Sequence, residues 1–156
     1  MDYAIIAAGE GSRLVEEGVT TPKPLVRLLG EPMIDRLMGL FLRHGATSIS
    51  VIVNEEMADV QHHMEQLALP VPLNLVVRST PSSMHSFHAL RPFLTSGTCC
   101  LTTVDTVFRE EPFAAYIDAF ERSPRRDDGR HGLRGRRGAA LCPDRLGGHD
   151  PRLPRP

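Results

Sequence analysis

The sequence predicts an α/β protein in which a mostly parallel sheet lies between two layers of helices. Four short apolar segments, at residues 3–8, 48–53, 73–77 and 99–103, are long enough for buried strands. The stretches between the later three have helical periodicity. Strands that are joined by single helices form right-handed parallel βαβ units with helices on both faces. The chain is therefore expected to form a three-layer α/β/α sandwich.

The elements are expected in a regular order along the chain. After the strand at 3–8, Glu31 and Pro32 open a helix that runs to about Arg43, and Gly45 is placed as its C-terminal stop. Ligands of such sheets bind beyond the carboxyl ends of the strands. The segments that directly follow the strands are therefore the places to look for a site. Further helices are expected at residues 54–67, 82–94 and 111–122.

Composition narrows the class of protein. The chain is 41% hydrophobic and 24% charged, which is typical of a soluble globular domain, and its 156 residues fit one domain. It has no apolar run of membrane-spanning length and no secretory leader, so we expect no membrane partner. Cys99, Cys100 and Cys142 form neither a disulfide framework nor a zinc motif, which indicates the reducing cytoplasm.

The last 34 residues differ from the rest. Residues 1–122 carry 9 basic and 15 acidic side chains, whereas residues 123–156 carry 9 arginines and 4 aspartates. Twenty of those 34 residues are Arg, Gly or Pro, a composition that buries too little apolar surface to order the chain. A basic arm for nucleic acid is disfavoured because aromatic residues are absent. We expect a domain at 1–122 and a tail that is disordered or read out of frame from near Ser123 in a GC-rich gene.

The chemistry-bearing feature is a lone lysine near a glycine loop. Lys23 is the single lysine of the chain and lies between Pro22 and Pro24. Upstream, Ala7-Ala8-Gly9-Glu10-Gly11-Ser12-Arg13-Leu14 follows the first strand. Glycine allows backbone N–H groups to turn toward an anion, and lysine and arginine both serve polyphosphates. The loop fits neither the Walker A nor the dinucleotide pattern. These first 25 residues predict an anion site.

At this point the chain resembles a known family. The glycine loop, then Pro22-Lys23-Pro24-Leu25, then Gly30-Glu31-Pro32-Met33-Ile34, is similar to the opening of the nucleotidyltransferases that activate sugar phosphates, which include a MobA-like branch. The resemblance covers about residues 3–122. It implies a Rossmann-like sheet of the nucleotide-diphospho-sugar transferase type. Glu16-Glu17-Gly18 departs from the family's usual residues at the loop tip.

The resemblance also implies roles for individual residues. Ala8, Gly9 and Gly11 would form the phosphate loop, with Arg13 on the β- and γ-phosphates of an NTP. Lys23 would act near the α-phosphate and the acceptor, so Arg13 and Lys23 are the expected catalytic residues. Asp105 follows the strand at 99–103 and would bind Mg²⁺, although an aspartate there can also simply turn the chain.

Other polar residues leave two interpretations open. Ser82 and Ser83 lie where relatives contact the base or the acceptor, but helix capping explains them equally well. Asn54 either touches substrate or turns the chain after its strand. The family's second metal-binding carboxylate comes from later in the chain, where this sequence is tail-like. The fold is therefore expected to be C-terminally incomplete.

The expected function is transfer of a nucleoside monophosphate from an NTP to a sugar 1-phosphate or a similar small phosphate. Pyrophosphate would be released and Mg²⁺ required, with no nucleic acid involved. Phosphocholine, another small phosphate and a molybdopterin-type cofactor are alternative acceptors within the superfamily. A different class of function is a nucleotide- or sugar-phosphate-binding module, either truncated or without catalysis. A nicotinamide-binding domain is disfavoured because the glycine pattern fails.

Overall fold

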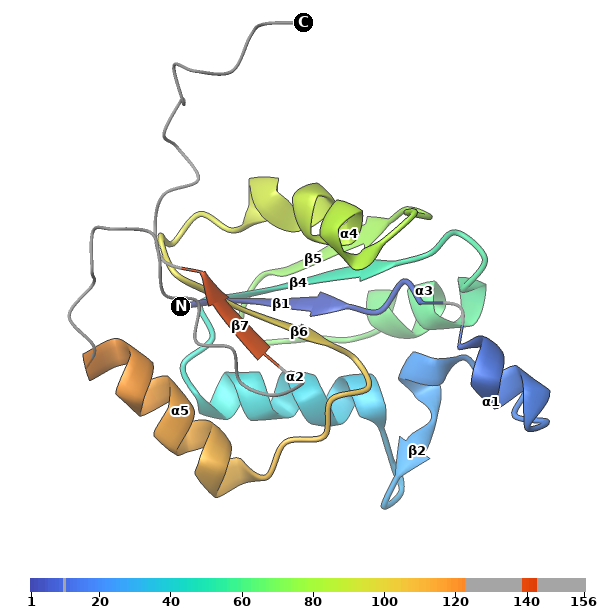
Figure 1. Cartoon of the computed structure of the whole chain (residues 1–156), viewed down its shortest axis with the longest axis horizontal. Helices are drawn as coiled ribbons and strands as arrows, with labels where there is room; N and C mark the ends of the chain where they lie inside the picture. Colours follow the sequence, from blue (N-terminus) through green and yellow to red (C-terminus); the bar gives the residue numbers. More distant parts are fainter. Residues whose placement is uncertain (10, 123–138, 143–156) are drawn as a thin grey trace, which may run out of the picture.

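In the computed structural model, a central sheet has helices on both sides (Figure 1). The structure describes residues 1–9, 11–122 and 139–142, except the side chains of Arg13 and of residues 139–142. The strands of the sheet are β1 (Asp2–Ile6), β4 (Ser48–Val53), β5 (Leu73–Val77), β6 (Cys99–Thr103) and β7 (Ala139–Cys142). A separate short hairpin contains β2 (Arg27–Leu28) and β3 (Glu31–Pro32). The helices are α1 (Ser12–Glu16), α2 (Met33–Arg43), α3 (Ala58–Glu65), α4 (Ser83–Leu90) and α5 (Glu110–Arg122), with 3₁₀ turns at Lys23–Leu25 and Arg91–Phe93.

The sheet has the strand order β5-β4-β1-β6-β7. The first four strands are parallel, and β7 is antiparallel to β6. Because Ile6 of β1 is in register with Ile52 of β4 and with Thr103 of β6, these strands end at one edge. The loops after β1, β4, β5 and β6 therefore meet at that edge.

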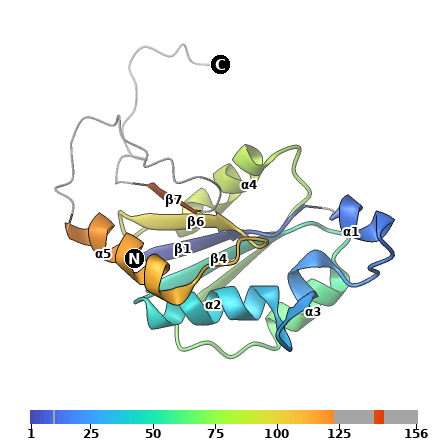
Figure 2. The same ribbon diagram turned by 60° about the horizontal axis from the view of Figure 1, so that its bottom comes forward.

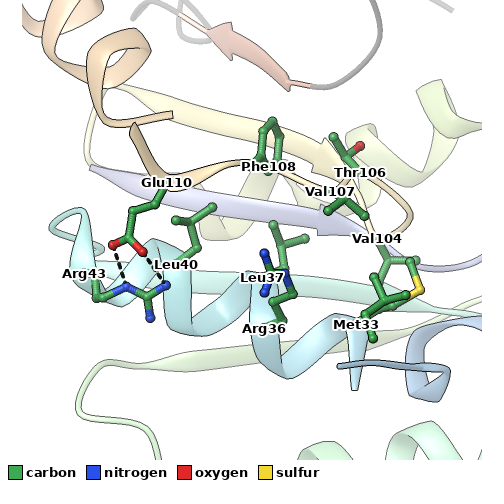
Figure 3. A pocket seen from close by; sticks show the side chains of 11 residues that line it. Met33, Arg36, Leu37, Leu40, Arg43, Val104, Thr106, Val107, Phe108 and Glu110 are labelled. Atoms are coloured by element: carbon green, nitrogen blue, oxygen red, sulfur yellow. Dashed lines mark hydrogen bonds and ion pairs between the residues drawn. The ribbon is translucent and has the colours of Figure 1, made fainter. Parts of the chain in front are cut away.

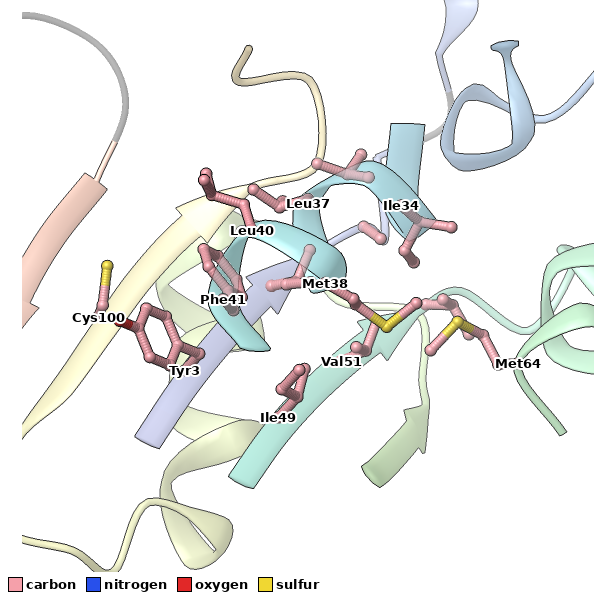
Figure 4. Close-up of a cluster of buried hydrophobic side chains, with 14 of the residues drawn as sticks. Tyr3, Ile34, Leu37, Met38, Leu40, Phe41, Ile49, Val51, Met64 and Cys100 are labelled. Atoms are coloured by element: carbon pink, nitrogen blue, oxygen red, sulfur yellow. The ribbon is translucent and has the colours of Figure 1, made fainter. Parts of the chain in front are cut away.

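The two faces of the sheet bury different layers. Tyr3 and Ile5 face α2, α3 and α5, whereas Ala4 and Ile6 face α4, as the alternation of side chains along a strand requires. Figure 2 shows α4 on one side of the sheet and α2 and α3 on the other. The larger core is close-packed around the ring of Tyr3, which stacks on Phe41 with ring centroids 4.3 Å apart (Figure 4). The predicted three-layer sandwich is confirmed.

Several helix boundaries differ from the predicted ones. The helix expected from Glu31 begins instead at Met33, because Glu31 and Pro32 pair with β2. The helix expected from Asn54 begins at Ala58, because the Asn54 side chain closes a turn by accepting the N–H of Glu56 at 3.0 Å. The helix expected to reach residue 94 gives way to a 3₁₀ turn at Arg91–Phe93.

Strand β7 was not predicted, since we expected no strand within 123–156. Its four residues, Ala-Ala-Leu-Cys, are the apolar part of that segment, and they pair with β6 from Cys99 to Thr102. The domain boundary at residue 122 and the out-of-frame interpretation concern mainly residues outside the described part. Within the described residues, no helix combines the length and the apolar character that a membrane span needs.

Candidate functional site

The glycine loop leaves β1 at the edge where the parallel strands end. The N–H of Ala7 still donates to the Ile52 carbonyl at 2.9 Å, and the chain then leaves the sheet. Gly9 is exposed, and a Cβ placed on it would meet no atom within 4 Å. Gly11 has φ +67°, and its Cβ would lie 3.4 Å from the Lys23 Cβ. Gly11 is therefore required by the backbone, whereas Gly9 borders open space.

Lys23 is the first residue of a short 3₁₀ turn, Lys23–Leu25, and has a proline on each side in the chain. Pro22 precedes the turn with φ −53°, and its carbonyl accepts the N–H of Leu25 at 2.8 Å. Pro24 is buried. The side chain of Lys23 is 28% exposed. The two prolines thus fix the backbone from which the ammonium group of Lys23 extends.

Lys23 and Asp105, 82 positions apart in the chain, form an ion pair with Nζ and Oδ2 2.8 Å apart. Asp105 follows β6 in a turn in which the Val104 N–H donates to the Ile6 carbonyl at 3.0 Å. The hydrogen bond from Lys23, followed by one from Thr103, holds the pKa of Asp105 below its usual value. The fold thus brings the predicted lysine and the predicted metal ligand into direct contact.

Asp105 is the residue of this site that could hold a metal ion. It is ionised at neutral pH, and its side chain is 48% exposed at the sheet edge. No cluster of three or more His, Cys, Asp or Glu side chains suited to a metal occurs in the described part of the chain. Mg²⁺ commonly binds through one or two carboxylates together with waters and substrate phosphates. The Asp105 carboxylate fits that ion when a phosphate and waters supply the further ligands.

The two predicted serines lie at the start of α4. Ser82 precedes the helix and Ser83 is its first residue, and α4 packs against β1 and β4 in the layer that includes Ala8. The Ser82 Oγ lies 2.8 Å from the His85 Nδ1, so this hydroxyl already has a partner one turn along its helix. The predicted role of the Arg13 side chain lies outside the described residues. The structure therefore brings Lys23 and Asp105 together beside the loop, whereas the side chain of Ser82 bonds within its own helix.

A second concavity lies beside this site rather than in it. It runs between α2 and residues 104–110 and does not include Lys23 or Asp105 (Figure 3). Leu37, Leu40 and Phe108 contribute to its apolar wall. Arg43 donates to both carboxylate oxygens of Glu110, at 2.8 and 3.3 Å, at one end.

Asn54 also contacts the glycine loop, and the sequence left its role open. It is 5% exposed at the end of β4, and its Nδ2 donates to the Ala8 carbonyl at 3.4 Å. Nothing in the sequence marks an asparagine after a strand as a contact of a loop 46 positions earlier. The contact can be expected only once the strand order, in which β4 lies beside β1, is known.

A family model and several known proteins match this chain. Residues 3–144 match the model of the MobA-like NTP transferase domain. The chain is 26% identical over 125 residues to the bifunctional protein GlmU of Thermodesulfovibrio yellowstonii, an alignment that covers 79% of this chain and 26% of that protein. It is 28% identical over 107 residues to the 2-aminoethylphosphonate cytidylyltransferase of Lancefieldella rimae, covering 69% of this chain and 44% of the relative.

Solved structures share the fold. The inositol-1-phosphate CTP transferase from T. maritima superposes with a TM-score of 0.63 at 20% identity, over 74% of this chain and 47% of that one. The present chain thus spans less than half the length of each of these three proteins.

Proposed function

We propose that this chain, which belongs to the MobA-like NTP transferase family, transfers a nucleoside monophosphate from an NTP to a small phosphorylated acceptor. The acceptor class is a sugar 1-phosphate or a similar small phosphate or phosphonate, and pyrophosphate is the second product. The reaction depends on Mg²⁺. The observation that carries this proposal is the 2.8 Å contact between Lys23 and Asp105 beside the glycine loop.

The reaction requires no covalent intermediate with the protein. An acceptor oxygen attacks the α-phosphorus, a new P–O bond forms, and the bond between the α-phosphorus and the bridging oxygen to the β-phosphate breaks. The electron pair leaves with pyrophosphate. Since the acceptor is already a nucleophile, the protein has to align the two anions and to neutralise their charge.

The residues of the site suit that task. The N–H groups of the loop that contains Ala8, Gly9 and Gly11 donate to phosphate oxygens, and Arg13 neutralises the β- and γ-phosphates. Lys23 neutralises charge at the α-phosphate and on the incoming acceptor. Asp105 holds Mg²⁺, which when bound supplies positive charge to the phosphates. The side chains of Ser82 and Ser83 are left for the base or the acceptor.

The names of relatives suggest which substrates to try first. One relative is a 2-aminoethylphosphonate cytidylyltransferase, and one structural neighbour is an inositol-1-phosphate CTP transferase. CTP is therefore the first donor, with a sugar 1-phosphate and 2-aminoethylphosphonate as the first acceptors.

A second candidate function is a nucleotide-binding module without turnover. It is favoured because the described residues contain no cluster of three or more side chains suited to hold a metal ion. Such a module would bind an NTP without consuming it.

The experiment is a pyrophosphate-release assay on the full chain with the four common NTPs, each acceptor in turn, and Mg²⁺ or EDTA. We expect Mg²⁺-dependent release with one donor and acceptor, and its loss in Asp105→Asn. Glu110→Gln, which removes an acidic partner from an exposed ion pair away from the site, is the matched control and should retain the rate. Binding of an NTP by calorimetry without release would support the second candidate, and absence of both would contradict the two together.

A further inference from the structure

Asn54 connects the end of β4 to the glycine loop. The directions of the backbone polar groups of Ile6, Ala7 and Ala8 show how this connection departs from a regular strand. Along an extended strand, successive residues turn their polar groups to opposite sides. Ile6 accepts a hydrogen bond from Val104 on the β6 side, and Ala7 donates to Ile52 on the β4 side. If β1 continued, Ala8 would turn to the β6 side. Its carbonyl instead faces Asn54.

The orientation of the Asn54 side chain follows from its partners. The Glu56 N–H can only donate, so the atom 3.0 Å from it must be the amide oxygen Oδ1. The Ala8 carbonyl can only accept, so its partner at 3.4 Å must be the amide nitrogen Nδ2. Both halves of the amide are thus assigned by chemistry. The residue is 5% exposed, which shields these contacts from water.

The backbone of Asn54 is itself held. Its carbonyl accepts the N–H of Met57 at 3.3 Å and the Nε2 of Gln61 at 3.3 Å. The N–H of Arg78 meanwhile donates to the carbonyl of Val53 at 2.8 Å. The amide that reaches Ala8 therefore projects from a fixed point on the sheet.

Holding the Ala8 carbonyl also fixes the direction of the next N–H. A trans peptide unit is planar, and its C=O and N–H point in opposite directions. The described residues contain no cis peptide bond. When the Ala8 carbonyl faces β4, the N–H of Gly9 must face away from β4, toward the side of the loop on which Asp105 and Lys23 lie. Apart from its chain neighbours, no atom lies within 4 Å of a Cβ placed on Gly9, so the loop surface is open at this residue.

We propose that Asn54 is a positioning residue that turns the N–H of Gly9 toward the phosphates of the bound nucleotide. The role rests on the proposed function, since the anion to be met is that of the donor NTP. Asn54 touches no substrate and acts through the peptide unit between Ala8 and Gly9. This assigns one of the two interpretations that the sequence left open, and gives the turn a purpose in binding.

The test compares one substitution at two asparagines. In Asn54→Thr the hydroxyl can still accept the Glu56 N–H, as in a serine–threonine turn, but it is too short to reach the Ala8 carbonyl. Asn74→Thr is the matched control. Asn74 also donates through its amide, to the Ser50 Oγ at 3.2 Å, but between β5 and β4 and away from the loop.

Two readouts separate positioning from general loosening. Calorimetric titration with MgCTP and the other MgNTPs measures nucleotide affinity, with the thermal midpoint recorded for each variant. We expect Kd to rise about tenfold in Asn54→Thr, which corresponds to about 1.4 kcal/mol, and to stay within twofold in Asn74→Thr. Equal loss of affinity in both variants, or none in Asn54→Thr, would overturn the proposal.

The second readout needs no nucleotide. The ¹⁵N resonance of Gly9 reports on the hydrogen bond to the carbonyl that precedes it. We expect it to move in Asn54→Thr and to stay in Asn74→Thr, with the free proteins compared by NMR. If the wild-type chain binds no NTP, the proposed function fails while this readout still decides whether Asn54 holds the peptide. An unmoved Gly9 resonance would reject the positioning role whatever the calorimetry gives.

Discussion

The two edges of the sheet each carry an aspartate, and the two residues behave in opposite ways. Asp2 opens β1 at the amino edge and is 3% exposed. Asp105 follows β6 at the carboxyl edge, with a side chain that is 48% exposed. Both have a lowered pKa. What distinguishes them is the kind of donor that stabilises the charge.

Asp2 is satisfied by neutral donors that belong to the fold. Burial alone would raise its pKa, but hydrogen bonds from the Ser96 N–H at 2.8 Å, the Ser48 Oγ at 2.8 Å and the Thr47 Oγ1 at 3.0 Å outweigh burial. These donors come from the start of β4 and from the segment before β6. Asp2 therefore ties three parts of the sheet together and has no capacity left for a ligand.

Asp105 depends instead mainly on the ammonium group of Lys23, with a second hydrogen bond from Thr103. A lysine ammonium on a flexible chain can move to another anion, and the carboxylate is then free for a metal ion. A lowered carboxyl pKa therefore does not by itself mark a site. A site is indicated where the partner can be exchanged and solvent has access.

The largest expected effect is on turnover at the carboxyl edge. Lys23→Ala removes a preorganised charge and should lower the rate of pyrophosphate release by about 10²–10³. Its thermal midpoint should change little, because a partly exposed ion pair contributes less than about 1 kcal/mol. Arg43→Ala, which breaks the exposed pair with Glu110, is the control and should keep the rate. A Lys23→Ala rate within a few-fold of wild type would refute the assignment.

The next effect is on stability at the amino edge. Asp2→Ala strands three part-buried donors, and we expect the free energy of unfolding in urea to fall by about 2–3 kcal/mol. Asp118→Ala removes an exposed acid that lies 3.8 Å from Arg122 and should stay within about 0.5 kcal/mol of wild type. A loss at Asp2 no larger than at Asp118 would show that the Asp2 network is dispensable.

The same network predicts an acid dependence. Because the pKa of Asp2 is lower in the folded state than the unfolded value of about 3.9, the unfolded chain takes up a proton first as the pH falls. The stabilisation is thus complete above about pH 4 and is lost as the pH falls through the folded pKa. Urea titrations should show the advantage of wild type over Asp2→Ala shrinking only in that range.

A smaller effect separates the two glycines of the loop. Gly11→Ala should cost about 1–2 kcal/mol, because the φ of +67° lies in the left-handed region that L side chains disfavour. Gly9→Ala should leave stability within about 0.5 kcal/mol but weaken NTP binding, since its methyl would occupy the open space before the loop. Urea titration and calorimetry measure the two quantities. Unchanged NTP affinity in Gly9→Ala would place the phosphates elsewhere.

The smallest effect is the salt dependence of the two carboxylates. Raising the salt from 0.1 to 1 M shortens the screening length from about 10 to about 3 Å. The small stability difference between wild type and Asp105→Asn should vanish, whereas the difference between wild type and Asp2→Ala should persist, because buried neutral donors are not screened. Urea titrations at both salt concentrations test this. The same salt dependence of stability at both positions would show that Asp2 and Asp105 are stabilised in the same way.

Local patterns predicted much of the fold because they depend on neighbouring residues. The strands at 48–53, 73–77 and 99–103 have the predicted bounds, since apolar runs between turn residues have few alternatives. The helix starts at Glu31 and Asn54 were wrong for a nonlocal or side-chain reason. Pairing with β2 took Glu31 and Pro32, and the Asn54 side chain captured the Glu56 N–H. Strand β7 escaped notice because only its pairing with β6 identifies it.

The sequence predicted the family, the parallel α/β class and the candidate residues Lys23 and Asp105, because short motifs and the periodicity of apolar side chains indicate them. The tertiary structure was needed to show that these two residues meet at 2.8 Å and that Asn54 contacts the glycine loop. The physical reason is the strand order. Placing β1 between β4 and β6 brings together loops that are distant in the chain, and no local pattern encodes that order.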